Sequence, residues 1–225
     1  MRGYQPVYVW VADLGAELSC TTLGSPGHSD QHRSARRDLA EYAVRTVVRE
    51  QNMAGEVEIL RCCDVCGGHE HGRPQVVGAP LHISASSSGR QAVVAICDSP
   101  VGVDIEILDK THEPPTNVLT TAEMTTLQGL GHPERWQAFL RLWTAKEAVT
   151  KADGRGLLAP LQQLDVSGAL RLPCTWVTLE GTRWYTQVVE IPALGVPTGF
   201  IALATGAPAR IVWRTLEPVS SGAHQ

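Results

Sequence analysis

Two acidic residues interrupt the apolar stretch VGVDIEIL at residues 101–108. Its β-branched composition predicts a strand, and side chains alternate between the two faces of a strand. Asp104 and Glu106 therefore project from one face, while Val103 and Ile105 project from the other. Neighbouring carboxylates repel each other unless a cation lies between them, and Mg²⁺ takes oxygen ligands of this kind. From this stretch alone, a magnesium site and a solvated edge strand are equally open.

A third acid lies on a predicted helix that opens at Pro133 and ends at Gly154. At 100° per residue, Glu147 continues an apolar stripe, and Lys151 follows one turn later. The stripe consists of Trp136, Leu140 and Trp143. A simple Glu–Lys pair explains the spacing, but it does not explain a carboxylate on a buried face. We therefore expect the three acids and Lys151 to form a site for a metal ion and phosphate groups.

The remaining pattern indicates the elements that must position these side chains. A capping box from Thr120 to Glu123 predicts the start of a further helix. Periodicity predicts a helix over 34–50, a loop over 61–80, and strands over 6–14, 56–60, 80–86, 91–98, 174–179, 183–190 and 199–205. Each half of the chain is then predicted to contain a strand, a helix and further strands, which is an α+β arrangement.

Two motifs resemble the paired signature of the 4′-phosphopantetheinyl transferases of the surfactin-synthetase-activating type. VGVDIE at 101–106 matches G-I/V-D-I/V-E, and LWTAKEAVTKADGRGL at 142–157 matches W-x-x-K-E-A/S-x-x-K-x-x-G-x-G-L. Weaker similarity covers HGRP at 71–74 and HISASSSGR at 82–90. The resemblance implies two similar α+β halves with a pseudo-two-fold relation and the active site between them. We place the halves at residues 1–103 and residues 104–225.

Enzymes of this family move the phosphopantetheine arm of coenzyme A (CoA) to a serine of a carrier protein and release adenosine 3′,5′-bisphosphate. The resemblance implies that Asp104, Glu106 and Glu147 hold Mg²⁺. It also implies that Glu147 accepts the proton of the serine, directly or through water. Lys151 is expected to contact the α-phosphate, and Lys146 is expected to assist in coenzyme binding. The sequence does not separate the two roles of Glu147.

The resemblance also implies a set of residues that hold the 3′-phosphate of the coenzyme. Arg73 matches the basic position of the family's H-G-K/R-P, and Arg36 lies on the first predicted helix, where other arginines compete for the same role. Ser86 matches a serine of the family pattern, but Ser87 stands where the family has a histidine. Because a serine brings no positive charge, we expect weaker coenzyme binding or discrimination.

Two other functions remain open. The same acids suit another metal-dependent enzyme of phosphate chemistry, such as a nucleotide pyrophosphatase. The stretch CCDVCGGHEHG also suggests a non-catalytic module built around a zinc loop, with Cys62, Cys63, Cys66, His69 and His71 as candidate ligands. Structural zinc sites usually show clearer four-ligand spacing, so a loop rich in Cys and Gly is the preferred interpretation.

Composition limits the partners of the chain. Its 225 residues are 43% hydrophobic and 19% charged, with a net charge of −4, which argues against a general nucleic-acid surface. No apolar run approaches the roughly 20 residues that a membrane span needs, and the first residues lack a clean signal sequence. We expect a cytoplasmic monomer that acts on neither nucleic acid nor membranes. The resemblance implies that its partner is an acyl or peptidyl carrier protein of a polyketide, nonribosomal peptide or fatty-acid synthase.

Overall fold

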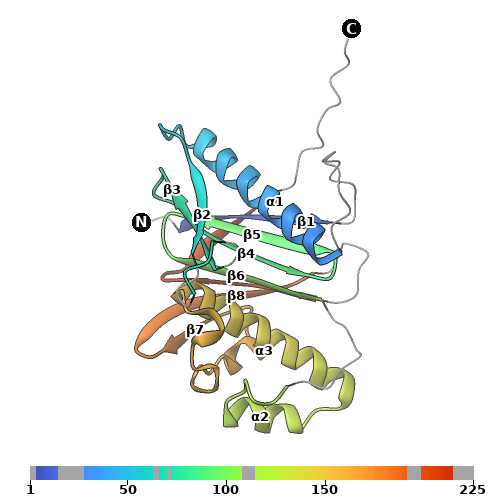
Figure 1. Cartoon of the computed structure of the whole chain (residues 1–225). Helices are drawn as coiled ribbons and strands as arrows, with labels where there is room; N and C mark the ends of the chain where they lie inside the picture. The colour runs from blue at the N-terminus through green and yellow to red at the C-terminus, as the bar shows by residue number, and fades with distance from the viewer. Residues whose placement is uncertain are drawn as a thin grey trace.

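Two four-stranded β-sheets, each covered by one long helix, form the centre of this computed structural model (Figure 1). The structure describes residues 4–14, 28–62, 66–69, 72–107, 115–191 and 199–214. Figure 1 shows the layers in the order helix α1, first sheet, second sheet, helix α3. The two sheets share a core between them, made of side chains such as Val9, Val93, Ala95, Val103, Ile105 and Leu203.

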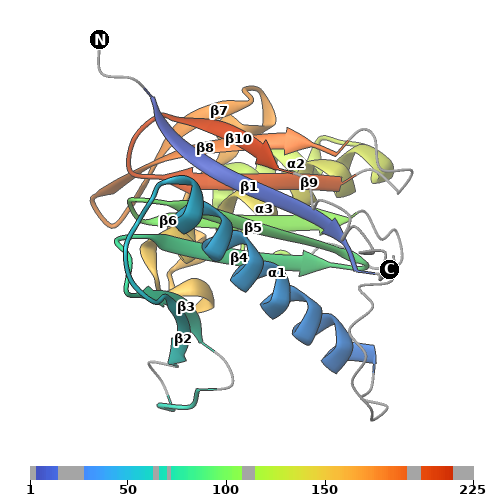
Figure 2. The same cartoon turned by 90° about the horizontal axis from the view of Figure 1, so that it is seen from above.

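The first sheet joins early and late parts of the chain in the strand order β10-β1-β5-β4. Strand β1 (Gln5–Asp13) runs antiparallel to β5 (Gln91–Cys97) and parallel to β10 (Ala209–Arg214). Strand β4 (His82–Ser88) is the opposite edge, and helix α1 (His28–Glu50) lies over β4 and β5 (Figure 2). The helix buries Leu39, Ala43 and Val47 against Ala92, Val94 and Ile96.

The second sheet is antiparallel throughout, in the order β6-β9-β8-β7. Its strands are β6 (Val101–Ile107), β7 (Cys174–Leu179), β8 (Thr182–Glu190) and β9 (Gly199–Thr205). Helix α3 (His132–Asp153) packs on β6 and β9, and helix α2 (Thr121–Gln128) precedes it. Three short 3₁₀ turns (156–158, 161–163 and 167–170) lead from α3 to β7.

Local signals explain where the helices of the second half begin and end. Helix α2 starts with the predicted capping box, in which Thr120 and Glu123 each bond the other's backbone N–H. Helix α3 has Pro133 in its first turn and ends at Gly154, which has the left-handed conformation (φ 98°) that favours glycine. These boundaries agree with the predicted ones.

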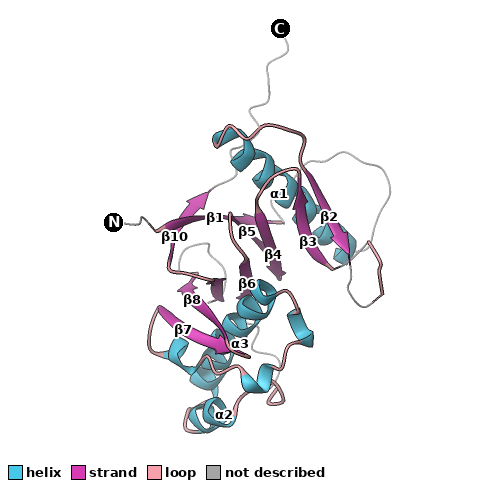
Figure 3. Cartoon of the chain, turned by 90° about the vertical axis from the view of Figure 1, so that its left-hand side faces the viewer, coloured by secondary structure: helices cyan, strands magenta, loops and turns pink. Residues whose placement is uncertain are grey.

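Two strands were not predicted, and one helix is longer than expected. Strand β3 (Arg73–Val77) lies inside the predicted loop and pairs with β2 (Glu58–Cys62), forming a hairpin beside α1 (Figure 3). Strand β10 lies beyond the last predicted strand, and α1 begins at His28 rather than residue 34. The short β3 opens with Arg-Pro and has only two apolar residues, so alternation alone is a weak signal there.

The mixed α+β fold agrees with the expectation, whereas the pseudo-two-fold relation and the boundary between residues 103 and 104 stay predictions. Strand β6 spans that boundary, and β10 returns from the second half to pair with β1. Within the described ranges, no helix is both long and apolar enough to cross a membrane.

Candidate active site

A glycine allows α3 to lie directly on the strand that carries the acids. A Cβ atom at Gly102 would lie 1.9 Å from the carbonyl oxygen of Ala148 and 2.5 Å from the backbone nitrogen of Ala152. Any other residue there would push the helix away from β6. The glycine of the VGVDIE motif therefore brings Glu147 and Lys151 of α3 close to Asp104 of β6.

Lys151 forms the centre of the resulting cluster. Its ammonium group donates to Asp104 Oδ1 at 2.6 Å and to Ser86 Oγ at 2.9 Å, and it lies 4.0 Å from Glu147 Oε2. The Ser86 hydroxyl donates in turn to Asp104 Oδ1 at 2.7 Å. Helix α3, strand β4 and strand β6 each contribute a polar group, so the cluster lies where the two sheets meet.

Glu106 is held by neutral donors from two different elements. The Ser88 hydroxyl donates to Glu106 Oε2 at 2.9 Å, and Trp143 Nε1 donates to Glu106 Oε1 at 3.1 Å. Ser88 Oγ also accepts from the backbone N–H of Ile107 at 3.1 Å. Each oxygen of Glu106 thus accepts one hydrogen bond, and the carboxylate has a fixed orientation.

Burial raises the pKa values of all three acids. For Asp104, burial outweighs the opposing effect of Lys151. For Glu106, burial and the charge of Asp104 raise the pKa against the bonds from Ser88 and Trp143. Burial raises the pKa of Glu147 to about 7, Asp104 and Glu106 add to the effect, and Lys151 opposes it. Burial thus disfavours the charged form of each acid, whereas a cation bound between them would favour it.

Two buried carboxylate oxygens of the cluster have no hydrogen-bond partner among the described residues. They are Asp104 Oδ2 and Glu147 Oε1, and both are buried. Buried, unpartnered carboxylate oxygens from a strand and a facing helix fit a hard divalent cation such as Mg²⁺. In the described part of the chain, however, no three acidic, His or Cys side chains stand in a ready metal-binding arrangement. Asp104 and Glu147 thus fit the expected metal, whereas the oxygens of Glu106 are already hydrogen-bonded.

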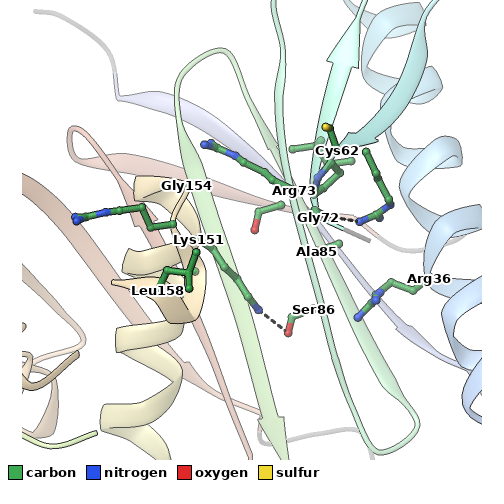
Figure 4. A pocket seen from close by; sticks show the side chains of 15 residues that line it. Arg36, Cys62, Gly72, Arg73, Ala85, Ser86, Lys151, Gly154 and Leu158 are labelled. Atoms are coloured by element: carbon green, nitrogen blue, oxygen red, sulfur yellow. Dashed lines mark hydrogen bonds between the residues drawn. The ribbon is translucent and has the colours of Figure 1, made fainter. Parts of the chain in front are cut away.

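A cavity of about 360 Å³ opens beside the cluster, between α1, the β2–β3 hairpin and the end of α3. Figure 4 shows Lys151 from α3 and Arg36 from α1 reaching toward Ser86 from opposite sides. The lining is strongly basic, and no acidic side chain is among the described residues that line it. The cations of the lining are Arg36, Arg61, Arg73, Lys151 and Arg155. This cavity is suited to a ligand with several negative charges.

Two arginines meet at the end of the cavity farther from the acids. Arg36 donates to the Ser87 hydroxyl at 3.2 Å, and Arg61 donates to the carbonyl of Gly72 at 3.2 Å. Burial, and then the nearby charges of Arg36 and Arg37, lower the pKa of Arg61. Crowded guanidinium groups are stabilised by an anion between them, such as a phosphate group. The expected Arg36 and Ser87 therefore lie together, and Arg61 is an addition that the motifs did not indicate.

Arg73 reaches the cavity from strand β3 and packs against the end of α3. A Cβ atom at Gly154 would lie 2.5 Å from Arg73 Nη1, so the glycine leaves room for the guanidinium group. The position is favourable because the C-terminal end of a helix attracts cations. The motif glycine thus serves two purposes, since it also ends the helix.

Lys146 is not among the described residues that line this cavity, and its contacts are structural, so its assistance in coenzyme binding stays a prediction. Its side chain is fully buried in an ion pair with Glu123, at 2.9 Å. It also donates to the carbonyl of Leu161 at 2.8 Å and to that of Leu164. Glu123 accepts in addition from the backbone N–H of Val166 at 2.9 Å. The pair ties α2, α3 and the segment after α3 together.

The proposed zinc loop is only partly covered by the structure. Cys62, Cys66 and His69 are described, whereas Cys63 and His71 lie outside the described residues. Cys62 and Cys66 are both exposed, and His69 Nδ1 lies 3.0 Å from the carbonyl oxygen of Arg61. The described members of this loop do not form a metal-binding group.

Comparison with known proteins agrees with the resemblance seen in the motifs. Residues 100–190 match the family model of the 4′-phosphopantetheinyl transferase superfamily. A 4′-phosphopantetheinyl transferase of Bacillus subtilis is 32% identical over 102 residues, which is 44% of this chain. The 4′-phosphopantetheinyl transferase Sfp of Bacillus subtilis (strain 168) is 29% identical over 139 residues, or 61% of this chain.

A third relative, the 4′-phosphopantetheinyl transferase gsp of Aneurinibacillus migulanus, is 32% identical over 94 residues, or 41% of this chain. The matches span 46%, 58% and 39% of these three relatives, so the chain covers about half the length of the curated proteins it matches. The family match begins at the strand that carries Asp104 and Glu106, and it includes the whole of α3.

Proposed function

We propose that this chain, whose residues 100–190 match the family model of the 4′-phosphopantetheinyl transferase superfamily, transfers the phosphopantetheine group of CoA to a serine of a carrier protein. The products are the holo carrier protein and adenosine 3′,5′-bisphosphate. The observation that carries the proposal is the pairing of a cavity whose described charged lining residues are all basic with a cluster of buried acids around Lys151.

The charges of CoA suit the two ends of this cavity. CoA carries a diphosphate and, separately, a phosphomonoester on the 3′-oxygen of its ribose. The diphosphate matches the end where Lys151 lies beside Asp104 and Glu147. The phosphomonoester matches the end where Arg36 and Arg61 meet.

Mg²⁺ is the expected cofactor, held by Asp104, Glu106 and Glu147. The unpartnered oxygens of Asp104 and Glu147 support this assignment, and the fixed carboxylate of Glu106 lies next to them. When bound, the ion would neutralise the charge that develops on the phosphate oxygens. Lys151 leaves Asp104 for the phosphate oxygens in this proposal, because the metal then balances the acids.

The side chains account for the remaining chemistry. The serine oxygen of the carrier attacks the β-phosphorus, and the bond from that phosphorus to the oxygen of the α-phosphate breaks. Glu147 accepts the serine proton, directly or through water, in this proposal. Lys151 stabilises the negative charge left on the α-phosphate.

Mass spectrometry of a carrier protein tests the proposal. An apo acyl or peptidyl carrier protein is incubated with CoA, Mg²⁺ and the wild-type chain, and the carrier should gain the phosphopantetheine mass. The Asp104→Ala variant and a reaction with chelator should leave the carrier unmodified. A carrier that gains no mass under any condition would contradict the proposal.

The same experiment separates the alternative enzyme class. If CoA is cleaved while the carrier stays unmodified, the chain is a hydrolase of the nucleotide pyrophosphatase type. The physiological carrier belongs to a polyketide, nonribosomal peptide or fatty-acid synthase in this proposal, and the enzyme acts as a cytoplasmic monomer. Comparing one carrier of each type ranks them as substrates.

A further inference from the structure

We infer that Ser88 is a positioning residue, which holds the Glu106 carboxylate in the orientation that metal binding requires. The inference rests on the proposed function, since it concerns the metal of that site. Ser88 belongs to none of the groups assigned above to the coenzyme or to Mg²⁺. Its hydroxyl contacts Glu106 from the opposite sheet, and it is the only contact from β4 to this acid among the hydrogen bonds of the described residues.

Ser88 and Trp143 each donate a hydrogen bond to a different oxygen of the Glu106 carboxylate. Ser88 donates to Oε2 at 2.9 Å, and Trp143 donates to Oε1 at 3.1 Å. Each oxygen keeps a second lone pair, so hydrogen bonding does not prevent it from binding a metal ion. Hydrogen-bond donors behind a ligating carboxylate fix its rotation and are part of an effective metal site.

The carboxylate has an alternative partner that these donors keep it from approaching. The Lys151 ammonium lies in the same cluster, on Asp104 Oδ1 at 2.6 Å, and its charge acts on Glu106. A carboxylate free to rotate would turn toward this cation. Both donors are neutral, so they orient the Glu106 carboxylate without repelling the Lys151 ammonium group from Asp104.

The serine row of β4 also provides a matched control. Ser84 and Ser88 lie on the same face of β4, and each hydroxyl accepts a backbone N–H of β6: Val103 N at 3.0 Å and Ile107 N at 3.1 Å. Of these two serines, Ser88 bonds an acid as well, whereas Ser84 contacts no carboxylate among the hydrogen bonds of the described residues. Ser84→Ala therefore removes the same link between strands but leaves Glu106 held.

The experiment measures binding of Mn²⁺ alone, followed by the loss of the electron paramagnetic resonance signal of the free ion. The proteins are the full-length wild type, Ser88→Ala, Ser88→Thr and Ser84→Ala. We expect Ser88→Ala to weaken Mn²⁺ binding about tenfold. Ser88→Thr keeps a hydroxyl and should bind within about twofold of wild type, and Ser84→Ala should do the same.

Transfer kinetics give a second readout that loss of stability does not produce. Ser88→Ala should raise the apparent KM for Mg²⁺ by a similar factor, while the KM for CoA at saturating Mg²⁺ stays within about twofold. Equal Mn²⁺ affinities for Ser88→Ala and Ser84→Ala would overturn the assignment. If the wild type neither binds Mn²⁺ nor modifies a carrier, the proposed function fails, and this inference fails with it. If the wild type does both, only the comparison of variants decides.

Discussion

Two lysines of α3 each pair with a carboxylate of another element, yet the two pairs have different surroundings. Lys146 pairs with Glu123, and both side chains are fully buried with every contact made by main-chain groups or each other. Lys151 pairs with Asp104, but a quarter of its side chain is exposed and Asp104 Oδ2 has no partner among the described residues. A pair with complete hydrogen bonding fixes structure, whereas a pair with an unpartnered oxygen can exchange its partner for a ligand.

The largest expected effect comes from the first pair. Lys146→Met should lower the free energy of unfolding by about 3–5 kcal/mol, because it leaves the Glu123 charge buried without its partner. Urea unfolding measures the change. Lys146→Met combined with Glu123→Gln should recover part of the loss, since it removes the buried charge. A loss below about 1 kcal/mol for the single variant would show that the pair does not hold these elements together.

The second pair should give the opposite pattern. Lys151→Met removes a partly exposed group that the proposal assigns to the phosphate oxygens, so carrier modification should slow by about 10²–10³-fold. Its free energy of unfolding should change less than that of Lys146→Met, because a quarter of the Lys151 side chain is exposed and Ser86 still donates to the buried Asp104. Single-turnover transfer and urea unfolding on the same preparation measure both effects. Large losses of stability in both lysine variants would remove the distinction between the pairs.

A third change tests the basic end of the cavity. Arg61→Ala should raise the KM for CoA by about tenfold or more, the scale of a lost charge-assisted hydrogen bond. With 3′-dephospho-CoA as substrate, the same variant should behave like the wild type, since the group that Arg61 would contact is missing. Arg45→Ala is the control, because Arg45 is an exposed residue of α1 paired with Glu41. An equal loss with both coenzymes would place Arg61 elsewhere on the ligand.

The smallest expected effect is a pH dependence without metal. The folded chain holds the proton of Glu147 up to a pKa of about 7, against an ordinary value of 4.5. Protonated Glu147 therefore contributes to the free energy of unfolding in full below pH 4.5, and this contribution is lost as the pH rises to about 7. Glu147→Gln cannot ionise and should raise Tm by about 2–4 °C at pH 8, but much less at pH 5. Glu41→Gln, at an exposed site, should shift Tm equally at both pH values.

Much of the site could be predicted from the sequence because its acids lie in regular elements. Strand alternation placed Asp104 and Glu106 on one face, and helical periodicity placed Glu147 and Lys151 on a buried face. The structure brings Lys151 to Asp104 as expected. Gly102 allows α3 to lie against β6, but in the sequence it could be recognised only as part of the VGVDIE motif.

Other assignments depend on contacts that local patterns do not contain. Lys146 and Lys151 stand in the same motif, and their different surroundings come from the segment at 161–166 and from α2. Arg61 lies in no motif, and it reaches the cavity only because β2 pairs with a strand that was expected to be loop. Ser88 shares a strand face with Ser86, a signal that alternation could have provided.

The pairing of β10 with β1 has a consequence for how the chain is made. Residues 5–10 align with 209–214, so the two partners are separated by nearly the whole described length. Because a ribosome synthesises the chain from its N-terminus, the edge of β1 that pairs with β10 stays unpaired until β10 emerges. Most of the first sheet is thus translated early, but the sheet is completed only when β10 is made. Ribosome-bound chains that stop before residue 209 should expose β1 to proteases or to pairing with other chains.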